Sequence, residues 1–188
     1  MPNVLYRWIE PHATPRALGF GALLWIASAL GVLTLRSRVA RRAGGLPLPD
    51  VQPFYGAGDL FTLLEQYGEP GRRAFLEFTL YDILYPCVAY GVAALALAAL
   101  MRPLVEARAR RAWMIVLPLA GLVVELLEQA GFLAALALFP ARVPALAGAV
   151  SVLTLAKFIL IAALVSSFGA LALWRALVSV RPRSPTPK

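Results

Sequence analysis

Residues 113–139 form the stretch WMIVLPLAGLVVELLEQAGFLAALALF, in which the only charged residues are Glu125 and Glu128. An α-helix needs about 20 largely apolar residues to cross the roughly 30 Å hydrocarbon layer of a bilayer. This stretch is long enough, and three further stretches meet the same criterion: residues 17–35, 78–101 and 143–178. The sequence therefore predicts an all-α, polytopic membrane protein built as a bundle of four transmembrane helices.

The composition supports a membrane protein and excludes two other classes. Of the 188 residues, 60% are apolar and 15% charged, and the mean hydropathy is +0.73. A soluble domain has about 45–50% apolar and about 25% charged residues, and a disordered chain has fewer apolar residues still. The net charge of +8 comes from basic residues that lie mostly between or beyond the apolar stretches. That placement is typical of topology signals, so we expect no nucleic-acid partner.

The chain is expected to form one transmembrane domain over residues 17–178, with an interfacial segment at residues 1–16 and a disordered tail at residues 179–188. The longest predicted extramembrane loop covers residues 36–75. Within it, apolar positions at 60, 61, 63, 64 and 67 share one helical face between a possible N-cap, Asp59, and a possible C-cap, Gly68. This pattern predicts a short amphipathic helix on the membrane surface or across the mouth of the bundle.

Four charged residues lie inside the predicted spans: Asp82, Glu125, Glu128 and Lys157. A charge at the bilayer centre costs about 2.5–3.5 kcal/mol on insertion scales, so such residues face a partner or a cavity. At a rise of 1.5 Å per residue, Glu125 and Lys157 lie at similar depths of about 20 Å from one membrane surface. We therefore expect Lys157 to pair with Glu125 or Glu128, and we regard all four residues as candidate catalytic groups if the protein is an enzyme.

Polar residues near these charges follow helical spacing. Glu125, Glu128 and Gln129 share one stripe, as do Ser151, Thr154 and Lys157. Candidate ligand-binding residues on or near the stripes are Tyr81, Tyr85, Gln129 and Thr154. Three acids and one lysine leave two surplus negative charges, so we expect at least one carboxyl group to carry a proton.

Two prolines are expected to open space beside this cluster. Pro86 cannot donate a hydrogen bond to the carbonyl of Asp82, and Pro118 cannot donate one to the carbonyl of Met114. Both spans should therefore kink.

Arg72 and Arg73 follow a predicted tight turn between Gly68 and Gly71, just before the second span. They are candidates for binding a lipid headgroup. The alternative is a turn with two arginines that extend to the interface without a specific ligand.

Motifs for metal or cofactor chemistry are not evident. The sequence has no Cys-x-x-Cys, no histidine pair at metal spacing and no phosphate-binding glycine loop. We therefore expect no metal and no cofactor.

The chain resembles a family of small four-span bacterial membrane proteins without an assigned function. The resemblance lies in the order of Asp59-Leu-Phe61, Tyr67-Gly-x-x-Gly71-Arg72, Asp82 and Pro86, followed by Glu125, Glu128 and Lys157. The resemblance implies a bacterial inner membrane and carries no activity. Four spans with buried carboxyl groups are also similar in architecture to the sterol-isomerase and sigma-2-receptor superfamily, although the histidine and tryptophan of an isomerase pocket have no counterpart here.

The partners and orientation follow from the spans. We expect membrane lipids as partners, and other membrane subunits or a homo-oligomer as further ones, since small residues recur along the spans and allow close helix packing. The side shared by the two termini carries more Lys and Arg, which predicts that both termini are cytoplasmic.

Three functions remain open. The first is a non-enzymatic accessory subunit or lipid-binding bundle whose charged cluster fixes the packing. The second is an acid/base enzyme or receptor for an isoprenoid-like lipophilic molecule, with Asp82 and Glu128 as the acid/base pair. This hypothesis requires a pocket that reaches the carboxyl groups and opens toward lipid. The third is a proton-coupled carrier with Glu125, Glu128 and Lys157 as a relay.

Overall fold

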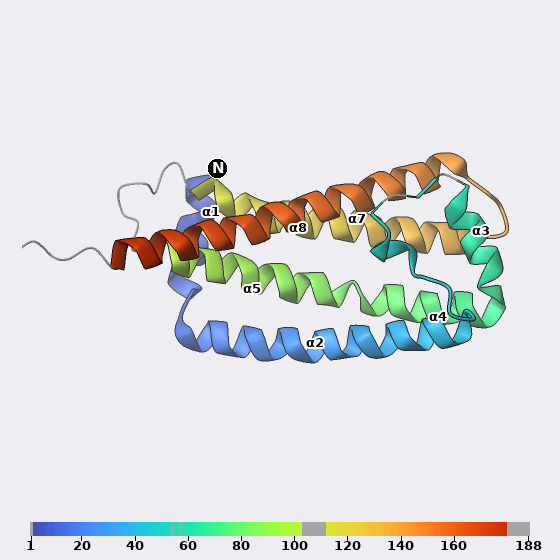
Figure 1. Cartoon of the computed structure of the whole chain (residues 1–188), viewed down its shortest axis with the longest axis horizontal. Helices are drawn as coiled ribbons and strands as arrows, with labels where there is room; N and C mark the ends of the chain where they lie inside the picture. Colours follow the sequence, from blue (N-terminus) through green and yellow to red (C-terminus); the bar gives the residue numbers. More distant parts are fainter. Residues whose placement is uncertain (1, 54, 57, 103–111, 180–188) are drawn as a thin grey trace, which may run out of the picture.

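The computed structural model describes residues 2–53, 55–56, 58–102 and 112–179, and every regular element among them is helical (Figure 1). Four helical segments are long and apolar enough to cross a membrane: Pro15–Arg42, Gly68–Met101, Val116–Leu138 and Pro144–Leu177. The predicted four-helix membrane bundle is thereby confirmed. The predicted tail lies outside the described residues, apart from Ser179.

The first span is α2 (Pro15–Arg42), which begins where the Thr14 hydroxyl accepts a hydrogen bond from the amide of Ala17 at 3.2 Å. The helix continues beyond the apolar stretch, since arginine is a good helix former. It ends just before Gly44 and Gly45, which both have positive φ. Residues 36–42 of the predicted extramembrane loop continue α2, and residues 68–75 belong to α4.

The second span consists of two helices, α4 (Gly68–Tyr81) and α5 (Leu84–Met101), interrupted at Asp82 and Ile83. Pro86 has no amide hydrogen to bond to the Asp82 carbonyl, so the predicted irregularity is confirmed. The kink predicted at Pro118 is wrong. Pro118 lies in the first turn of α7 (Val116–Leu138), where a proline is tolerated because its amide has no helical partner.

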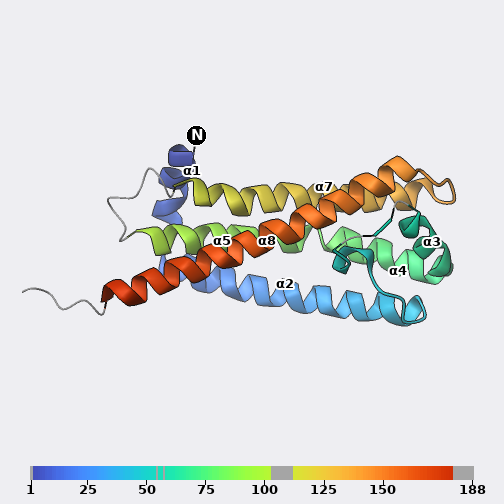
Figure 2. The ribbon, with the colours of Figure 1, turned by 45° about the horizontal axis from the view of Figure 1, so that its top comes forward.

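The fourth span, α8 (Pro144–Ser179), has 36 residues, which corresponds to about 54 Å of helix. This exceeds the roughly 30 Å of hydrocarbon that a helix must cross. Figure 2 shows α8 running obliquely across α5 and α7.

Short elements close the two ends of the bundle. α1 (Pro2–Ile9) and η1 (Glu10–His12) lie at the same end as η4 (Ala112–Ile115) and the last turns of α8 (Figures 1 and 2). At the other end, α3 (Asp59–Gln66) buries its apolar face, Leu60, Phe61 and Leu64. The predicted amphipathic helix is thus present and covers the bundle end, although its N-cap is Gly58 and Asp59 is its first residue.

The predicted turn between Gly68 and Gly71 is wrong. Gly68 has φ +60° and opens α4, whereas Gly71 lies inside that helix. A Cβ atom at Gly71 would lie 3.2 Å from the backbone of Ala43. Glycine is therefore needed here for the close approach of α4 to the end of α2 rather than for a turn.

The core is divided into two apolar clusters by a polar layer. One cluster surrounds Phe61, Phe75, Phe78 and Phe132, and the other surrounds Tyr90, Leu97, Ile115 and Leu164. Between them along the helices lie buried polar residues, which we call the polar layer: Ser28, Thr79, Asp82, Glu128, Gln129, Ser151, Thr154 and Lys157. The polar layer is where candidate functional groups are concentrated.

Replacing Gly121 by alanine should destabilise the bundle. A Cβ atom at Gly121 would lie within 3 Å of the buried Tyr90 ring, and overpacking of this kind costs about 1–3 kcal/mol. The matched control is Gly91→Ala, since a Cβ atom there meets nothing within 4 Å. Thermal unfolding in detergent should show a lower Tm for Gly121→Ala alone. Equal Tm values for the two variants would contradict this packing.

Candidate functional site

The centre of the polar layer is an ion pair between α7 and α8. Lys157 Nζ donates to Glu128 Oε2 at 2.7 Å and to the backbone carbonyl of Asp50 at 3.0 Å. The other Glu128 oxygen accepts from the Thr154 hydroxyl at 2.5 Å. Glu128 is completely buried and Lys157 is 5% exposed. The predicted pairing of Lys157 is confirmed, with Glu128 as the partner.

Asp82 and Glu125 are the two carboxyl groups that remain. Asp82 is buried at the break between α4 and α5, and its Oδ2 accepts from Gln129 Nε2 at 2.7 Å. Glu128 and Gln129 are adjacent on α7. Glu128 bonds to α8, and Gln129 bonds to the break between α4 and α5. Glu125 is half-buried and makes no hydrogen bond or ion pair with any described residue.

The described residues between α2 and α3 (43–53, 55–56 and 58) lie alongside the bundle, and we call them the strap (Figure 1). Its short helix η2 (Pro49–Val51) places Asp50 beside Arg36, with 3.1 Å between Asp50 Oδ2 and an Arg36 guanidinium nitrogen. The Asp50 carbonyl accepts from Lys157. The sequence analysis singled out neither Asp50 nor Arg36, because both lie in the predicted extramembrane loop, outside the apolar stretches.

A second attachment of the strap involves Tyr55 and Ser151. The Ser151 hydroxyl donates to the Tyr55 carbonyl at 2.8 Å and accepts from the Tyr55 amide at 3.3 Å. The Tyr55 hydroxyl lies 3.5 Å from that of Thr154. Irregular backbone beside membrane spans is tolerated when it is buried in protein and hydrogen-bonded. The strap meets this condition at Tyr55.

The predicted tyrosine sites differ in their surroundings. Tyr85 accepts a hydrogen bond from the Trp25 indole at 3.3 Å and lines the largest cavity described below. Tyr81 instead packs against Gly31, and its hydroxyl lies 3.5 Å from the Ser28 carbonyl.

The predicted headgroup arginines also differ. Arg72 donates to the Leu64 carbonyl at 3.1 Å, and its guanidinium lies 4.3 Å from the centre of the Phe139 ring. Arg72 is therefore engaged in holding α4 against α3 and the end of α7. Arg73 is exposed, so a contact with lipid headgroups remains a prediction for this residue.

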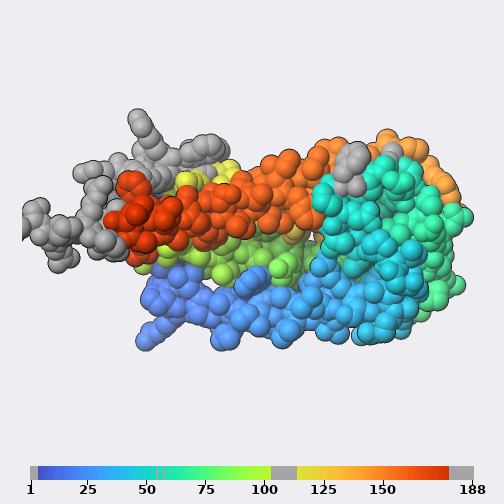
Figure 3. Space-filling model, viewed as in Figure 1, coloured from blue at the N-terminus to red at the C-terminus, as the bar shows by residue number. Residues whose placement is uncertain are grey.

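A cavity of about 400 Å³ lies between α2 and α8. Its polar wall contains five charged residues: Arg36, Asp50, Asp82, Glu125 and Lys157. Its apolar and aromatic wall contains Ala29, Val32, Leu33, Val51, Tyr85, Phe158 and Ile161. Figure 3 shows a furrow between α8 and α2 with α5 visible at its floor.

A second cavity of about 230 Å³ continues this space and is largely apolar. The two cavities share Tyr85, Glu125 and Ile161, and the second is further lined by Trp25, Ala89, Tyr90 and Leu164. Glu125 therefore stands between a charged chamber and an apolar slot.

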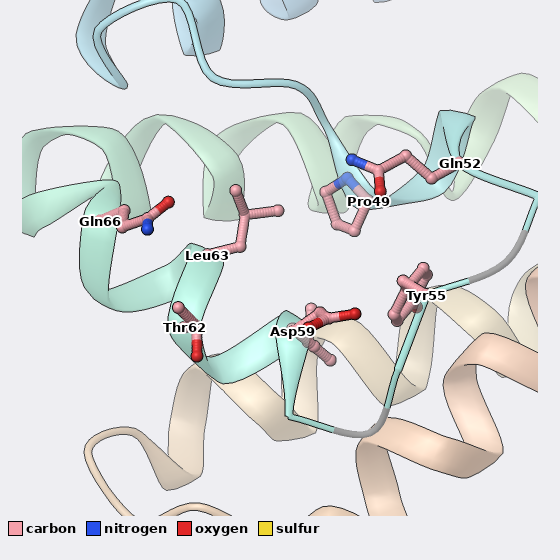
Figure 4. Close-up of a pocket in the computed structure, with 8 residues that line it drawn as sticks. Pro49, Gln52, Tyr55, Asp59, Thr62, Leu63 and Gln66 are labelled. Atoms are coloured by element: carbon pink, nitrogen blue, oxygen red, sulfur yellow. The ribbon is translucent and has the colours of Figure 1, made fainter.

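A third cavity of about 220 Å³ lies between the strap and α3 (Figure 4). It is lined by Pro49, Gln52, Tyr55, Asp59, Leu60, Thr62, Leu63 and Gln66. Its one acidic side chain, Asp59, accepts a hydrogen bond from the Gly56 amide at 2.6 Å and so holds the strap. Neither Asp82 nor Glu125 lines this cavity.

The charges around the largest cavity fall into two pairs and two remaining acids. Arg36 pairs with Asp50, and Lys157 pairs with Glu128. Asp82 and Glu125 have no cationic partner among the residues that the structure describes. Within the same described ranges, no group of three His, Cys, Asp or Glu side chains is placed to hold a metal ion.

Comparisons with protein-family models, curated proteins and solved structures found no match for this chain.

Replacing Lys157 by methionine should strongly destabilise the protein. The variant leaves the Glu128 carboxylate buried without its cation, and breaking a buried pair in this way costs about 3–5 kcal/mol. The double variant Lys157→Met/Glu128→Gln should recover part of the loss because it removes both charges. The measurement is denaturant unfolding in detergent. A single variant as stable as the parent protein would show that the pair does not hold the bundle.

The strap generates a pH-dependent prediction. Burial raises the pKa of Tyr55 to about 12, a shift partly offset by the hydrogen bond between the Tyr55 and Thr154 hydroxyls. In the unfolded chain a tyrosine loses its proton at about pH 10. Between these values the unfolded state binds fewer protons, so the free energy of unfolding should fall by about 2–3 kcal/mol as pH rises from about 10 to 12.

Tm measured across this pH range should decrease less steeply for Tyr55→Phe than for the parent protein, since the variant has no phenol to ionise. Parallel decreases in both proteins would mean that Tyr55 is not buried as described.

Proposed function

We propose that this protein is a non-enzymatic membrane protein that binds a lipid-like amphiphile in the furrow between α2 and α8. The observation that carries the proposal is the cavity of about 400 Å³ that joins apolar walls to Asp82 and Glu125. Small-molecule sites commonly have about 300–1,000 Å³, mostly apolar walls and a few placed polar groups. This cavity fits that description.

The position of the cavity supports an amphiphilic ligand. α2 exposes large apolar side chains as far as Leu33, and basic residues follow from Arg36 onward. The cavity wall includes both Leu33 and Arg36. The end of the cavity at Leu33 and Arg36 therefore lies where the surface of α2 changes from apolar to polar, which is the level at which lipid tails meet headgroups.

The packing of α2 supports access from the membrane. α2 packs mainly against α4 and α5 rather than α8. The cavities between α2 and α8 are bordered by exposed apolar residues such as Trp25 and Ile161. A lipid chain can enter such a furrow without crossing water.

The contacts of Glu128 favour a binding role over acid/base catalysis. Both Glu128 oxygens are occupied, by Thr154 and by Lys157, and the residue is completely buried. An acid/base residue must reach the proton it transfers. The alternative, an enzyme or receptor acting on an isoprenoid-like molecule, would therefore have to use Asp82 and Glu125, which line the cavity.

The proposed setting is a bacterial inner membrane with both termini in the cytoplasm. α1 and the end of α8 lie at one end of the bundle (Figure 1). The residues near that end include several of the basic side chains that favour a cytoplasmic location. Membrane lipids are the partners that this proposal requires, and it leaves room for a role as an accessory subunit.

Photolabelling in nanodiscs tests the proposal. A phospholipid with a diazirine in its acyl chain should label residues of α2, α5 and α8 that line the furrow. Ala29→Trp fills part of the cavity and should reduce the labelling about tenfold, which corresponds to a loss of about 1.4 kcal/mol of binding free energy. The matched control is Leu30→Trp, which places the same side chain at a neighbouring position that is 60% exposed.

Leu30→Trp should leave the labelling of the furrow unchanged. Equal labelling of the parent protein and both variants, or labelling spread evenly over all exposed apolar positions, would refute a binding site in the furrow.

A further inference from the structure

We propose that the ligand's polar head is a protonated amine, seated against Glu125 in the wall of the cavity between α2 and α8. The inference rests on the proposed function, because it names the chemistry of the molecule that the furrow would bind. It follows from the charges and the unused hydrogen-bond acceptors of the cavity wall.

The charge balance of the wall favours a cation. The two cationic side chains of the wall are each paired with a carboxylate: Arg36 with Asp50 at 3.1 Å, and Lys157 with Glu128 at 2.7 Å. Asp82 and Glu125 also line the cavity, and neither has a cationic partner among the described residues. A charged group in a low-dielectric site is stable only when it is compensated. A ligand cation would compensate one of the two carboxyl groups as a carboxylate, and the other is neutral when it carries a proton.

The unused acceptors fit an ammonium group. A primary ammonium presents three N–H donors and no acceptor. Glu125 makes no hydrogen bond with the described residues, and Asp82 uses Oδ2 for Gln129. Asp50 is 7% exposed and lines the same cavity, and its buried Oδ1 has no partner in the described part of the chain. The three carboxyl groups thus offer the acceptors that the donors need.

The arrangement of the wall places the amine near Glu125. Arg36 also has a buried nitrogen without a partner, Nε, and its positive charge would repel an ammonium group. Glu125 borders the apolar slot and is accompanied by Tyr85. Aromatic rings attract cations through their π faces. A long-chain amine could therefore place its head at Glu125 and its chain in the slot.

An anionic head fits this wall less well. A phosphate or carboxylate would need a free cation, and both Arg36 and Lys157 already neutralise an acid. It would also face the unpaired Asp82 and Glu125, and like charges in a low-dielectric site repel strongly.

Two matched photoprobes test the inference: a long-chain primary amine with a diazirine in its chain, and the alcohol of the same chain and diazirine position. Both are added to the full-length protein in nanodiscs at equal membrane concentration. The amine should label the cavity wall about tenfold more than the alcohol, a difference of about 1.4 kcal/mol, and Glu125→Gln should remove this preference because the ammonium group loses its charged partner. Glu125 makes no described hydrogen bond, so the variant should fold.

The control variant is Glu77→Gln, which removes an acid that pairs with Arg38 outside the cavity. It should keep the preference for the amine. Equal labelling by amine and alcohol in the parent protein would overturn the amine assignment and leave the binding site intact. A preference that survives Glu125→Gln, or that Glu77→Gln also removes, would overturn the role of Glu125. Absence of furrow labelling by either probe would instead refute the proposed function itself.

Discussion

The buried ion pair between Lys157 and Glu128 is the interaction on which the rest of the structure depends. A lysine in the fourth span can be accommodated only if its charge is compensated within the protein. Glu128 supplies the opposite charge from α7, and the Asp50 carbonyl supplies a further acceptor from the strap. A single ammonium group therefore holds together two spans and a segment more than 100 residues away along the chain.

The attachment of the strap explains how the cavity is formed. By meeting Lys157, η2 brings the Asp50 carboxylate to Arg36 and closes one end of the space between α2 and α8. Asp50 thereby neutralises Arg36, and Glu128 neutralises Lys157. Glu125 on α7 and Asp82 at the break of the second span are left without a cation among the described residues. A bundle stabilised only by packing would not require Glu125 to face an open cavity without a partner. We therefore expect a ligand to bind at Asp82 and Glu125 rather than at the buried pair.

The fold and part of the site could be predicted from the sequence because both depend on local periodicity. Twenty-residue apolar stretches define spans, and the spacing of Ser151, Thr154 and Lys157 places them on one helical face. Depth along the spans predicted that Lys157 pairs with Glu125 or Glu128. Glu125, which matched Lys157 in depth, makes no ion pair with a described residue, and Glu128, three residues further along α7, is the partner. A proline near Asp82 likewise indicated the break in the second span.

The strap contacts could not be predicted in this way. Asp50 lies in a stretch rich in glycine and proline that has no periodicity, and its partners are fixed only by the path of the backbone. Arg36 follows an apolar stretch, where arginine ordinarily sets topology. Gly71 was interpreted as a turn residue, yet it serves the approach of two helices. Proline at residue 118 gives the same local signal as at residue 86, and only the start of α7 distinguishes the two cases.

An experimental structure of the full chain in a nanodisc of native lipids is the most direct test of a ligand-binding furrow. The account predicts elongated non-protein density between α2 and α8, with one end within hydrogen-bond distance of Glu125 and the remainder in the apolar slot beside Trp25 and Leu164. A furrow closed by direct packing of α2 against α8, with Glu125 paired to another side chain, would contradict it.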